Sequence, residues 1–271
     1  MIRLAVRVAR ADAELALAEL LVLAPEGVEE VDAGDDVVEY AIYGAEGELP
    51  DLGEVRAAAG EALVEVSSTV VGDDWAQRWR EFHRPLQLAG LRLRAPWHEA
   101  QEGLEVVIDP GQAFGTGMHP TTRLCLELLL AEPAARRACP LADLGCGSGV
   151  LAIAAAKLGW APVDGYDHEA ESVQATIDNA AANGVEVGAH PWDLRRDPIP
   201  QAPTAAANLL RPLLLELAER MTAPPETLIA SGLLEAEAGE VAEAFARHGL
   251  REHARRSRDG WAAVLLRRAA A

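Results

Sequence analysis

Three glycines alternate with other residues in the run Asp143–Gly149 (DLGCGSG). A short apolar stretch precedes this run and an Ala/Leu-rich stretch follows it, which predicts a strand, a glycine-rich turn and a helix. Glycine has no Cβ and tolerates positive φ, so such a turn lets a nucleotide ligand approach the backbone closely. We therefore predict a nucleotide site in this turn, with Asp143, Gly145 and Gly147 among its residues.

The spacing of the glycines indicates which nucleotide to expect. A dinucleotide fingerprint, G-x-G-x-x-G or G-x-G-x-x-A, would require a small residue where this chain has Val150. Instead, an acid precedes the first glycine in the pattern D-x-G-x-G-x-G. That pattern is typical of S-adenosylmethionine (AdoMet) sites in Rossmann-like methyltransferases, so we expect AdoMet as the cofactor and not NAD.

Two acids follow the next predicted strands. Asp167 ends a strand 18 residues after Gly149, and an acid in that place of a doubly wound sheet can accept both ribose hydroxyls. The alternative role for Asp167 is a cap for the predicted helix Glu169–Ala182. Asp193 follows the third strand and could bond the adenine amine, or lie at the surface without a ligand.

Asn208 ends the fourth predicted strand, at the edge where ligands bind in open α/β sheets. Its amide offers donors and an acceptor without charge. The carbonyl can therefore hold a neutral amine by its N–H, whereas a carboxylate would favour the protonated, unreactive ammonium. We predict that Asn208 is the catalytic residue for a nitrogen acceptor. A helix cap is the alternative.

The segment Asp109–Thr122 combines glycines and prolines with one aromatic side chain before a predicted helix. A loop with so much special backbone is rarely only a connection. We interpret it as a mobile flap over the cofactor, with Phe114 lining the pocket and Thr122 bonding the methionine portion. The alternative is a capped helix start, in which His119 and Thr121 form the cap.

The predicted elements that position these residues fall into two groups. Residues 1–70 show the order βαββαβ, which is that of a small ferredoxin-like α+β sandwich. From Pro120 onward, helices and strands alternate, and the last two strands are joined by a hairpin turn at 258–260. This order predicts a mostly parallel α/β sheet with an antiparallel edge.

These groups suggest a domain organisation. We predict a ferredoxin-like substrate-recognition domain over residues 1–71, a linker over 72–98 and a methyltransferase domain over 99–271. Three tryptophans near the linker are interpreted as packing residues, with substrate contact as the alternative: Trp75, Trp79 and Trp97.

The composition excludes several classes of protein. Half of the 271 residues are apolar, but no apolar run reaches the ~18 residues of a membrane span. The N-terminal stretch has no features of a signal peptide and the three cysteines suggest neither a disulfide framework nor a metal site, so we expect a cytoplasmic protein.

Acidic residues dominate the charge, and most of all at the N-terminus. The net charge is −19, and residues 1–70 hold 16 Asp and Glu against four Arg and no Lys. Such a surface repels nucleic acid and attracts basic proteins, although acidity also serves solubility alone. We expect a basic protein partner, no direct binding of nucleic acid or membrane, and a monomer.

Taken together, the motifs resemble the PrmA family, bacterial methyltransferases of the large-subunit ribosomal protein L-eleven. The resemblance covers nearly the whole chain and includes the acidic N-terminal domain, and its most specific piece is Phe114–Gly117. The matching segments are Asp109–Thr122, Asp143–Gly149, Asp167, Asn179–Gly184, Ala207–Leu209 and Ser231–Glu235. Two segments depart from the family pattern, Thr204–Ala207 before the Asn motif and Ala223–Pro225 before the fifth strand.

The resemblance implies an α/β fold with a Rossmann-like class I methyltransferase sheet. It implies AdoMet-dependent methylation of lysine side chains and an N-terminal α-amine of a ribosomal protein, which the N-terminal domain recognises. Carried over by motif, the AdoMet-site residues include Thr122, Gly145, Asp167 and Asn208, and Thr116 lies in the family-specific segment. Two alternatives stay open: a methyltransferase of the same fold for another amine, small molecule or RNA, and a noncatalytic AdoMet-binding assembly factor.

Overall fold

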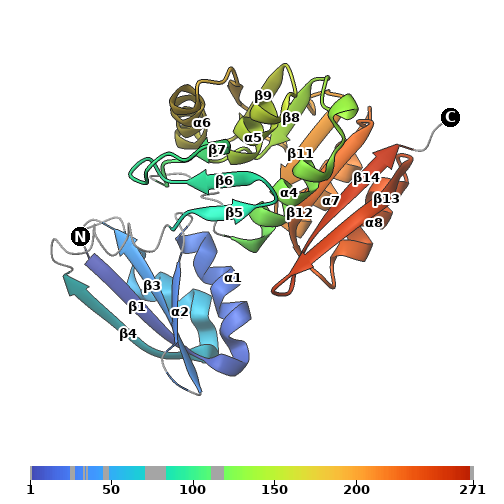
Figure 1. The fold of residues 1–271 in the computed structure, drawn as a ribbon. Coiled ribbons are helices and arrows are strands. Elements are labelled where there is room, and N and C mark those ends of the chain that lie inside the picture. The colour runs from blue at the N-terminus through green and yellow to red at the C-terminus, as the bar shows by residue number, and fades with distance from the viewer. Residues whose placement is uncertain are drawn as a thin grey trace. The chain divides into compact units, whose positions relative to one another are not determined.

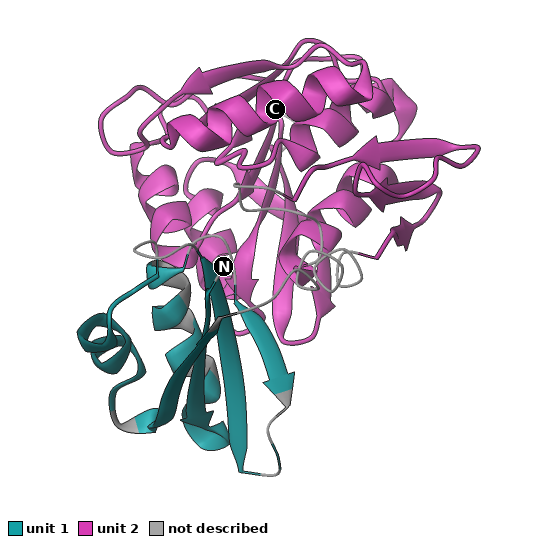
Figure 2. Ribbon diagram, turned by 90° about the vertical axis from the view of Figure 1, so that its left-hand side faces the viewer, with its two compact units in different colours: residues 1–82 teal, residues 83–271 magenta. Residues whose placement is uncertain are grey.

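The computed structural model describes residues 2–24, 28–32, 34, 36–44, 49–70, 84–110 and 119–268. The chain divides into two compact units, residues 1–82 and 83–271, which Figure 2 distinguishes by colour. Each unit has its own sheets and its own apolar core, so each is described by itself.

Unit 1 is a four-stranded antiparallel sheet with two helices. The strand order is β2-β3-β1-β4, with Val6 of β1 opposite Tyr40 of β3. This is the arrangement of a split βαβ, or ferredoxin-like, sandwich, as the sequence predicted. Its elements, labelled in Figure 1, are β1 (Ile2–Ala9), α1 (Ala13–Leu23), β2 (Glu29–Asp32), β3 (Val37–Gly44), α2 (Leu52–Ala59) and β4 (Leu63–Val70).

The two faces of this sheet differ because side chains alternate along each strand. One face carries Leu4 and Val6 into a core with Leu20 of α1 and Val55 of α2. The other face carries charged and hydroxyl groups joined in one network. Arg3 pairs with Glu39 and donates to the Tyr43 hydroxyl, Arg7 pairs with Glu39 and Glu65, and Tyr43 donates to Glu29.

Unit 2 is built around a seven-stranded sheet with the order β10-β9-β8-β11-β12-β14-β13. The strands from β10 to β12 are parallel, whereas β14 and β13 are antiparallel to their neighbours. Its elements are β8 (Leu141–Leu144), α5 (Val150–Leu158), β9 (Val163–Asp167), α6 (Ala170–Asn183), β10 (Gly188–Pro191), β11 (Thr204–Asn208), α7 (Arg211–Arg220), β12 (Thr227–Leu234), α8 (Ala238–Ala246), β13 (Leu250–Arg258) and β14 (Trp261–Arg268). The α/β class with its antiparallel C-terminal hairpin is thereby confirmed.

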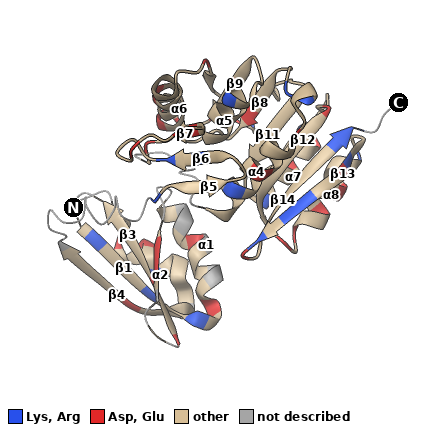
Figure 3. Cartoon of the chain, viewed as in Figure 1, with Lys and Arg blue, Asp and Glu red and all other residues tan. Residues whose placement is uncertain are grey.

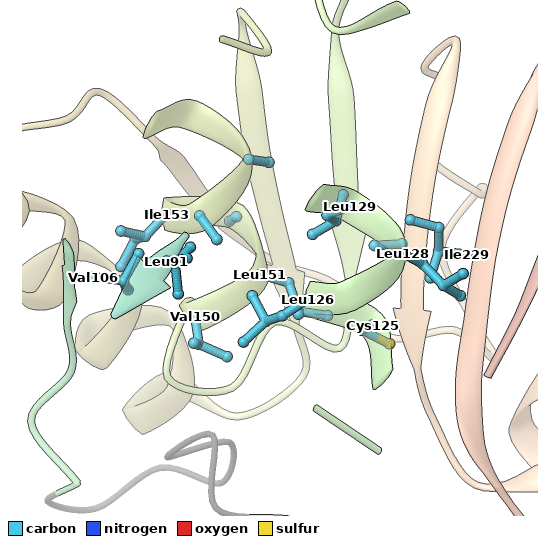
Figure 4. Packing of buried hydrophobic residues seen from close by; sticks show 14 of the residues in the cluster. Leu91, Val106, Cys125, Leu126, Leu128, Leu129, Val150, Leu151, Ile153 and Ile229 are labelled. Atoms are coloured by element: carbon cyan, nitrogen blue, oxygen red, sulfur yellow. The ribbon is translucent and has the colours of Figure 1, made fainter. Parts of the chain in front are cut away.

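Apolar residues cover both faces of this sheet. On one face, α4 (Pro120–Ala131), α5 and the strands share a cluster that includes Leu126, Leu151 and Ile229, shown in Figure 4. On the other face, α7 and α8 pack through a second cluster that includes Leu214 and Phe245. Burial on both faces explains why the strands β11, β12 and β14 have no alternation of polar and apolar residues in sequence.

A second, three-stranded sheet precedes the main one in the chain. It consists of β5 (Leu86–Leu88), β6 (Leu91–Arg94) and β7 (Leu104–Val107), with β5 antiparallel and β7 parallel to β6. Leu91 and Val106 place it on the cluster of α4 and α5. The strands β5 and β6 fall within the range predicted as linker, yet they belong to unit 2. Trp75 and Trp79 lie outside the described residues.

Among the described residues, no helix is both long and apolar enough to span a bilayer.

Candidate functional site

The glycine-rich turn joins β8 to α5 and is held against β9. The backbone N–H groups of Gly145 and Cys146 donate to the carbonyl of Tyr166, at 2.8 and 3.1 Å. Gly145, Gly147 and Gly149 all have positive φ, between +53° and +78°. The turn therefore uses the freedom that the sequence predicted for these glycines.

Three glycines let backbone segments approach closely around this turn. A Cβ at Gly145 would lie 2.4 Å from Leu209 Cδ2, and one at Gly149 would lie 2.9 Å from Thr176 Cγ2. At Gly232 of β12, it would lie 2.3 Å from the Leu209 carbonyl oxygen. Leu209 thus lies against both Gly145 and Gly232, which brings the end of β11 beside the glycine-rich turn.

Asp167 joins the second strand to the same turn. Its Oδ2 accepts from the Gly147 N–H at 2.9 Å and its Oδ1 from the Glu169 N–H at 3.1 Å. The second bond orders the entry to α6, although the N-cap residue of that helix is Glu169. Each carboxylate oxygen keeps a further lone pair after these bonds. The geometry therefore fits an acceptor of two ribose hydroxyls as well as a local structural role.

Asn208 and Thr122 meet although 86 residues separate them in the chain. The Asn208 Nδ2 donates to Thr122 Oγ1 at 3.3 Å, and Thr122 is fully buried in the first turn of α4. The Asn208 Oδ1 is buried and has no hydrogen-bond partner within the described residues. A buried carbonyl oxygen without a donor calls for a ligand or a water that supplies one.

The start of α4 is fixed by a histidine cap. The Thr121 N–H donates to His119 Nδ1 at 3.4 Å, and burial lowers the His119 pKa. Ser231 Oγ of β12 donates to the Thr121 carbonyl at 3.3 Å. The last residues of the segment Asp109–Thr122 therefore form the capped helix start, which is one of the two interpretations of this segment. Phe114 and Thr116, predicted for the flap, lie outside the described residues.

Asp143 lies beneath the glycine-rich turn and is fully buried. Its Oδ2 accepts from the Ala152 N–H of α5 at 3.1 Å, while Oδ1 has no partner among the described residues. Burial raises the pKa of this carboxyl to about 7, and the nearby Asp167 adds to the effect. The visible bond of Asp143 supports the turn, and its cofactor contact stays a prediction.

Asp193 follows β10 in the neighbouring connection. Its Oδ1 accepts from the Arg195 N–H at 2.8 Å, and its side chain remains partly exposed beside Arg196. The preceding Trp192 N–H donates to the Asp167 carbonyl at 2.7 Å, which keeps this segment near the second strand. The adenine contact of Asp193 also stays a prediction.

Two asparagines on α6 have a role that spacing alone did not reveal. Asn179 accepts from the Asp109 N–H at 3.0 Å and donates to the Ser148 carbonyl at 2.9 Å. Asn183, one helical turn later, exchanges two bonds with the backbone of Val107. These i and i+4 side chains therefore tie β7 and its continuation to the glycine-rich turn. Two asparagines four residues apart in a predicted polar helix are the sequence signal that could have indicated these backbone contacts.

Comparison with known proteins agrees with this geometry. The chain is similar to the ribosomal protein L11 methyltransferase of Pseudomonas paraeruginosa, with 38% identity over 208 residues, which is 74% of this chain and 70% of the relative. It is 39% identical to that of Azotobacter vinelandii over 202 residues, 72% of this chain and 68% of the relative.

A solved structure shows the same architecture. The ribosomal protein L11 methylase of Lactobacillus delbrueckii subsp. bulgaricus superimposes with a TM-score of 0.60 and 27% identity, over 68% of this chain and 99% of that one. The family model of the ribosomal protein L11 methyltransferases (PrmA) matches residues 11–269. The match confirms the resemblance seen in the sequence, and the chain belongs to the PrmA family of methyltransferases.

Proposed function

We propose that this protein is an AdoMet-dependent methyltransferase of ribosomal protein L11, acting on lysine side chains and the N-terminal α-amine. The observation that carries the proposal is the Asn208 Oδ1 beside Thr122, which is buried and has no partner in the part of the chain that the structure describes. An uncharged acceptor in that place can take the N–H of a neutral amine without stabilising its ammonium form.

The described residues fit the proposed cofactor. Gly145 and Gly147, both at positive φ, lie in the turn after β8, at the carboxyl end of the parallel strands where ligands bind in open α/β sheets. Asp167 would accept the ribose hydroxyls, Thr122 would bond the methionine portion and Asp193 the adenine amine. Phe114, Thr116 and Asp143 complete the proposed cofactor site. When bound, AdoMet supplies a methyl group that its sulfonium already activates.

The chain's own contribution is to position a neutral amine. A lysine with a pKa of ~10.4 is almost wholly protonated at neutral pH, and a dry site lowers that value. Asn208 Oδ1 would then accept one N–H and leave the nitrogen lone pair directed at the methyl group. The proton of the product leaves to water, since the described site offers no carboxylate beside Asn208.

Unit 1 supports the choice of a basic protein substrate. Its first 70 residues carry a net charge of −12, and they contain none of the motifs described for unit 2. Ribosomal proteins are basic because they bind RNA, so attraction to unit 1 would steer the substrate to the enzyme. The enzyme is proposed to act as a monomer without binding nucleic acid.

Mass spectrometry of the candidate substrate tests the proposal. Incubation of L11 with the enzyme and AdoMet should add ~14 Da per methyl group, on lysines and on the α-amine. Titration calorimetry with AdoMet and with NAD should show binding of AdoMet only. An unmodified substrate together with intact AdoMet binding would favour the noncatalytic assembly factor. Methylation of a different amine would favour another substrate for the same fold.

A further inference from the structure

Two exposed leucines lie beside the ends of β11 and β12. Leu210 is 60% exposed and Leu234 is 43% exposed, and only three other large apolar side chains in the described residues are exposed to a similar degree. Leu210 comes two residues after Asn208. Leu234 comes two residues after Gly232, which packs against Leu209. Both leucines thus belong to the edge of the sheet that carries Asn208.

A shared carboxylate holds the two leucine-bearing segments together. The Glu237 Oε2 accepts from the Leu234 N–H at 2.9 Å, and its Oε1 pairs with Arg211 Nε at 3.3 Å. Arg211 is the residue after Leu210, and it also pairs with Glu240 at 2.8 Å. The Leu209 N–H, on the other side, donates to the Ser231 carbonyl at 3.0 Å. These bonds therefore fix the backbone at Leu210 and Leu234 relative to each other.

Leu210 also occupies a position where leucine is a poor choice for stability. It is the N-cap residue of α7, and no side chain caps this helix. Ser, Thr, Asp and Asn are strongly favoured at an N-cap because they accept a bond from the free N–H groups of the first turn. Position 210 thus lacks a capping side chain and exposes an apolar one. A contact between Leu210 and a bound ligand would explain both the missing cap and the exposed leucine.

We propose that Leu210 and Leu234 form an apolar lip that receives the methylene stem of the acceptor lysine as its amine reaches Asn208. This inference rests on the proposed function. A lysine offers four methylene groups before its amine, and burying them against leucine removes apolar surface from water. The same contact displaces water from around the amine, which favours its neutral form. Arg211, the residue after Leu210, does not compete with the lysine, because it is paired with Glu237 and Glu240.

The lip distinguishes between the two kinds of amine. An N-terminal α-amine has no methylene stem, so its nitrogen can reach Asn208 without filling the lip. Loss of the leucines should therefore weaken methylation of lysines and leave that of the α-amine nearly unchanged. This difference separates the proposed contact from a general loss of structure, which would lower both rates together.

The test compares the full-length variants Leu210→Ala, Leu234→Ala and Leu210→Ala/Leu234→Ala with the wild-type enzyme, using the ribosomal protein as substrate. The KM for lysine methylation should rise about fivefold in each single variant and at least tenfold in the double variant, with an unchanged Kd for AdoMet. Ile177→Ala is the matched control, because Ile177 of α6 is exposed to the same 43% as Leu234. It should behave as the wild type.

Leu210→Ser sharpens the test because it supplies the missing cap. This variant should raise the Tm by about 2 °C while it lowers kcat/KM for lysine, as a structural role of Leu210 would not. Leu210→Met should keep the wild-type rate. Unchanged lysine kinetics in the double variant, or equal losses on lysine and α-amine, would overturn the lip while the proposed function stands. Absence of methylation by the wild type would overturn both.

Discussion

Each unit buries an acid on a strand, but the two acids have different surroundings. Glu39 of unit 1 is bonded by two arginines, and the bond from Arg3, more than the one from Arg7, holds its pKa below the usual value. Asp143 of unit 2 accepts one backbone bond, its other oxygen has no partner among the described residues, and burial raises its pKa to about 7. A satisfied acid stabilises the sheet that carries it, whereas an unsatisfied one is a cost to it.

The same contrast holds beyond these two acids. On the open face of the unit 1 sheet, charged groups and the Tyr43 hydroxyl bond one another, and no buried side-chain oxygen or nitrogen in its described residues lacks a partner. In unit 2, the Asn208 Oδ1 and the Asp143 Oδ1 have no partner within the described residues, and both side chains belong to parallel strands. We infer that chemistry belongs to unit 2 and that unit 1 contributes charge and shape. Figure 3 shows how the charges are spread over both units.

The largest expected effect is at Asn208. Asn208→Ala removes the proposed acceptor for the amine, and kcat should fall on the order of 100-fold while the Kd for AdoMet rises much less. Steady-state kinetics and titration calorimetry measure the two quantities. Thr121→Ser is the control, because it changes a residue next to Thr122 while it keeps the side-chain hydroxyl. Equal losses of turnover and cofactor affinity would assign Asn208 to cofactor binding alone.

Asn208→Asp tests the chemical reason for an uncharged acceptor. A carboxylate in this position stabilises the ammonium form and raises the amine pKa, so less nucleophile is present at neutral pH. The variant should be slow at pH 7 and regain rate as the pH rises. Full activity at pH 7 would reject the proposed role of the amide.

Removal of unit 1 is expected to have the next largest effect. A chain that begins at His83, where unit 2 begins, should keep its affinity for AdoMet. Its kcat/KM for the ribosomal protein should fall about 100-fold, because the acidic surface proposed to attract the substrate is gone. If the shortened enzyme methylates the ribosomal protein at the full-length rate, unit 1 does not recognise the substrate. If the kcat/KM of the full-length enzyme does not fall as the salt concentration rises, charge attraction is not the reason for the contribution of unit 1.

Much of this architecture was accessible from the sequence because its signals are local. The glycine-rich run and the strand before it predict the turn at Gly145, and Asp259–Gly260 predicts the last hairpin, whose residues both adopt positive φ. The βαββαβ order of unit 1 follows from periodicity alone. The proximity of Asn208 to the turn follows from the rule that the ends of parallel strands meet at one edge.

Features that depend on register or on distant packing were not accessible. The Glu39 network requires Arg3 and Arg7 to lie on the same face as Glu39, which only the pairing of β1 with β3 decides. The three-residue strand β5 is too short for a periodic signal. The burial of Asp143 and the exposure of Leu210 depend on segments far away in the chain. The ligand contacts of the site residues stay predictions.

Asp167→Ala should weaken cofactor binding. The two proposed ribose hydroxyl bonds to this charged acceptor are worth roughly 1.5–3 kcal/mol each, so the Kd for AdoMet should rise at least about 100-fold. Asp164→Ala on the same strand is the control, since Asp164 pairs with His190 instead of the turn. Unchanged affinity in a folded Asp167 variant would leave that residue with only its bonds to Gly147 and Glu169.

Glu39→Gln tests the saturated network of unit 1. The pKa of Glu39 is lowered in the folded state, so its contribution is present above its unfolded pKa and is lost as the pH falls through the folded value. At pH 7 the variant should lose about 2 kcal/mol of unfolding free energy, and the difference should shrink in acid. Urea unfolding of the unit 1 transition at several pH values measures it. AdoMet binding should not change.

Asp143→Asn should show the opposite dependence, with a smaller effect. Its folded pKa of about 7 lies above the unfolded value, so between the two values the folded protein holds a proton that the unfolded chain has released. The wild type must therefore lose stability as the pH rises through this range, whereas an amide does not titrate. Between pH 6 and pH 8 the variant should gain about 1 kcal/mol relative to the wild type, measured by urea unfolding without AdoMet. The surrounding thiols of Cys125 and Cys146 do not interfere, because burial raises the pKa of both. A parallel pH dependence of the two proteins would mean that Asp143 is already satisfied in the folded state, and the contrast with Glu39 would then rest on Asn208 alone.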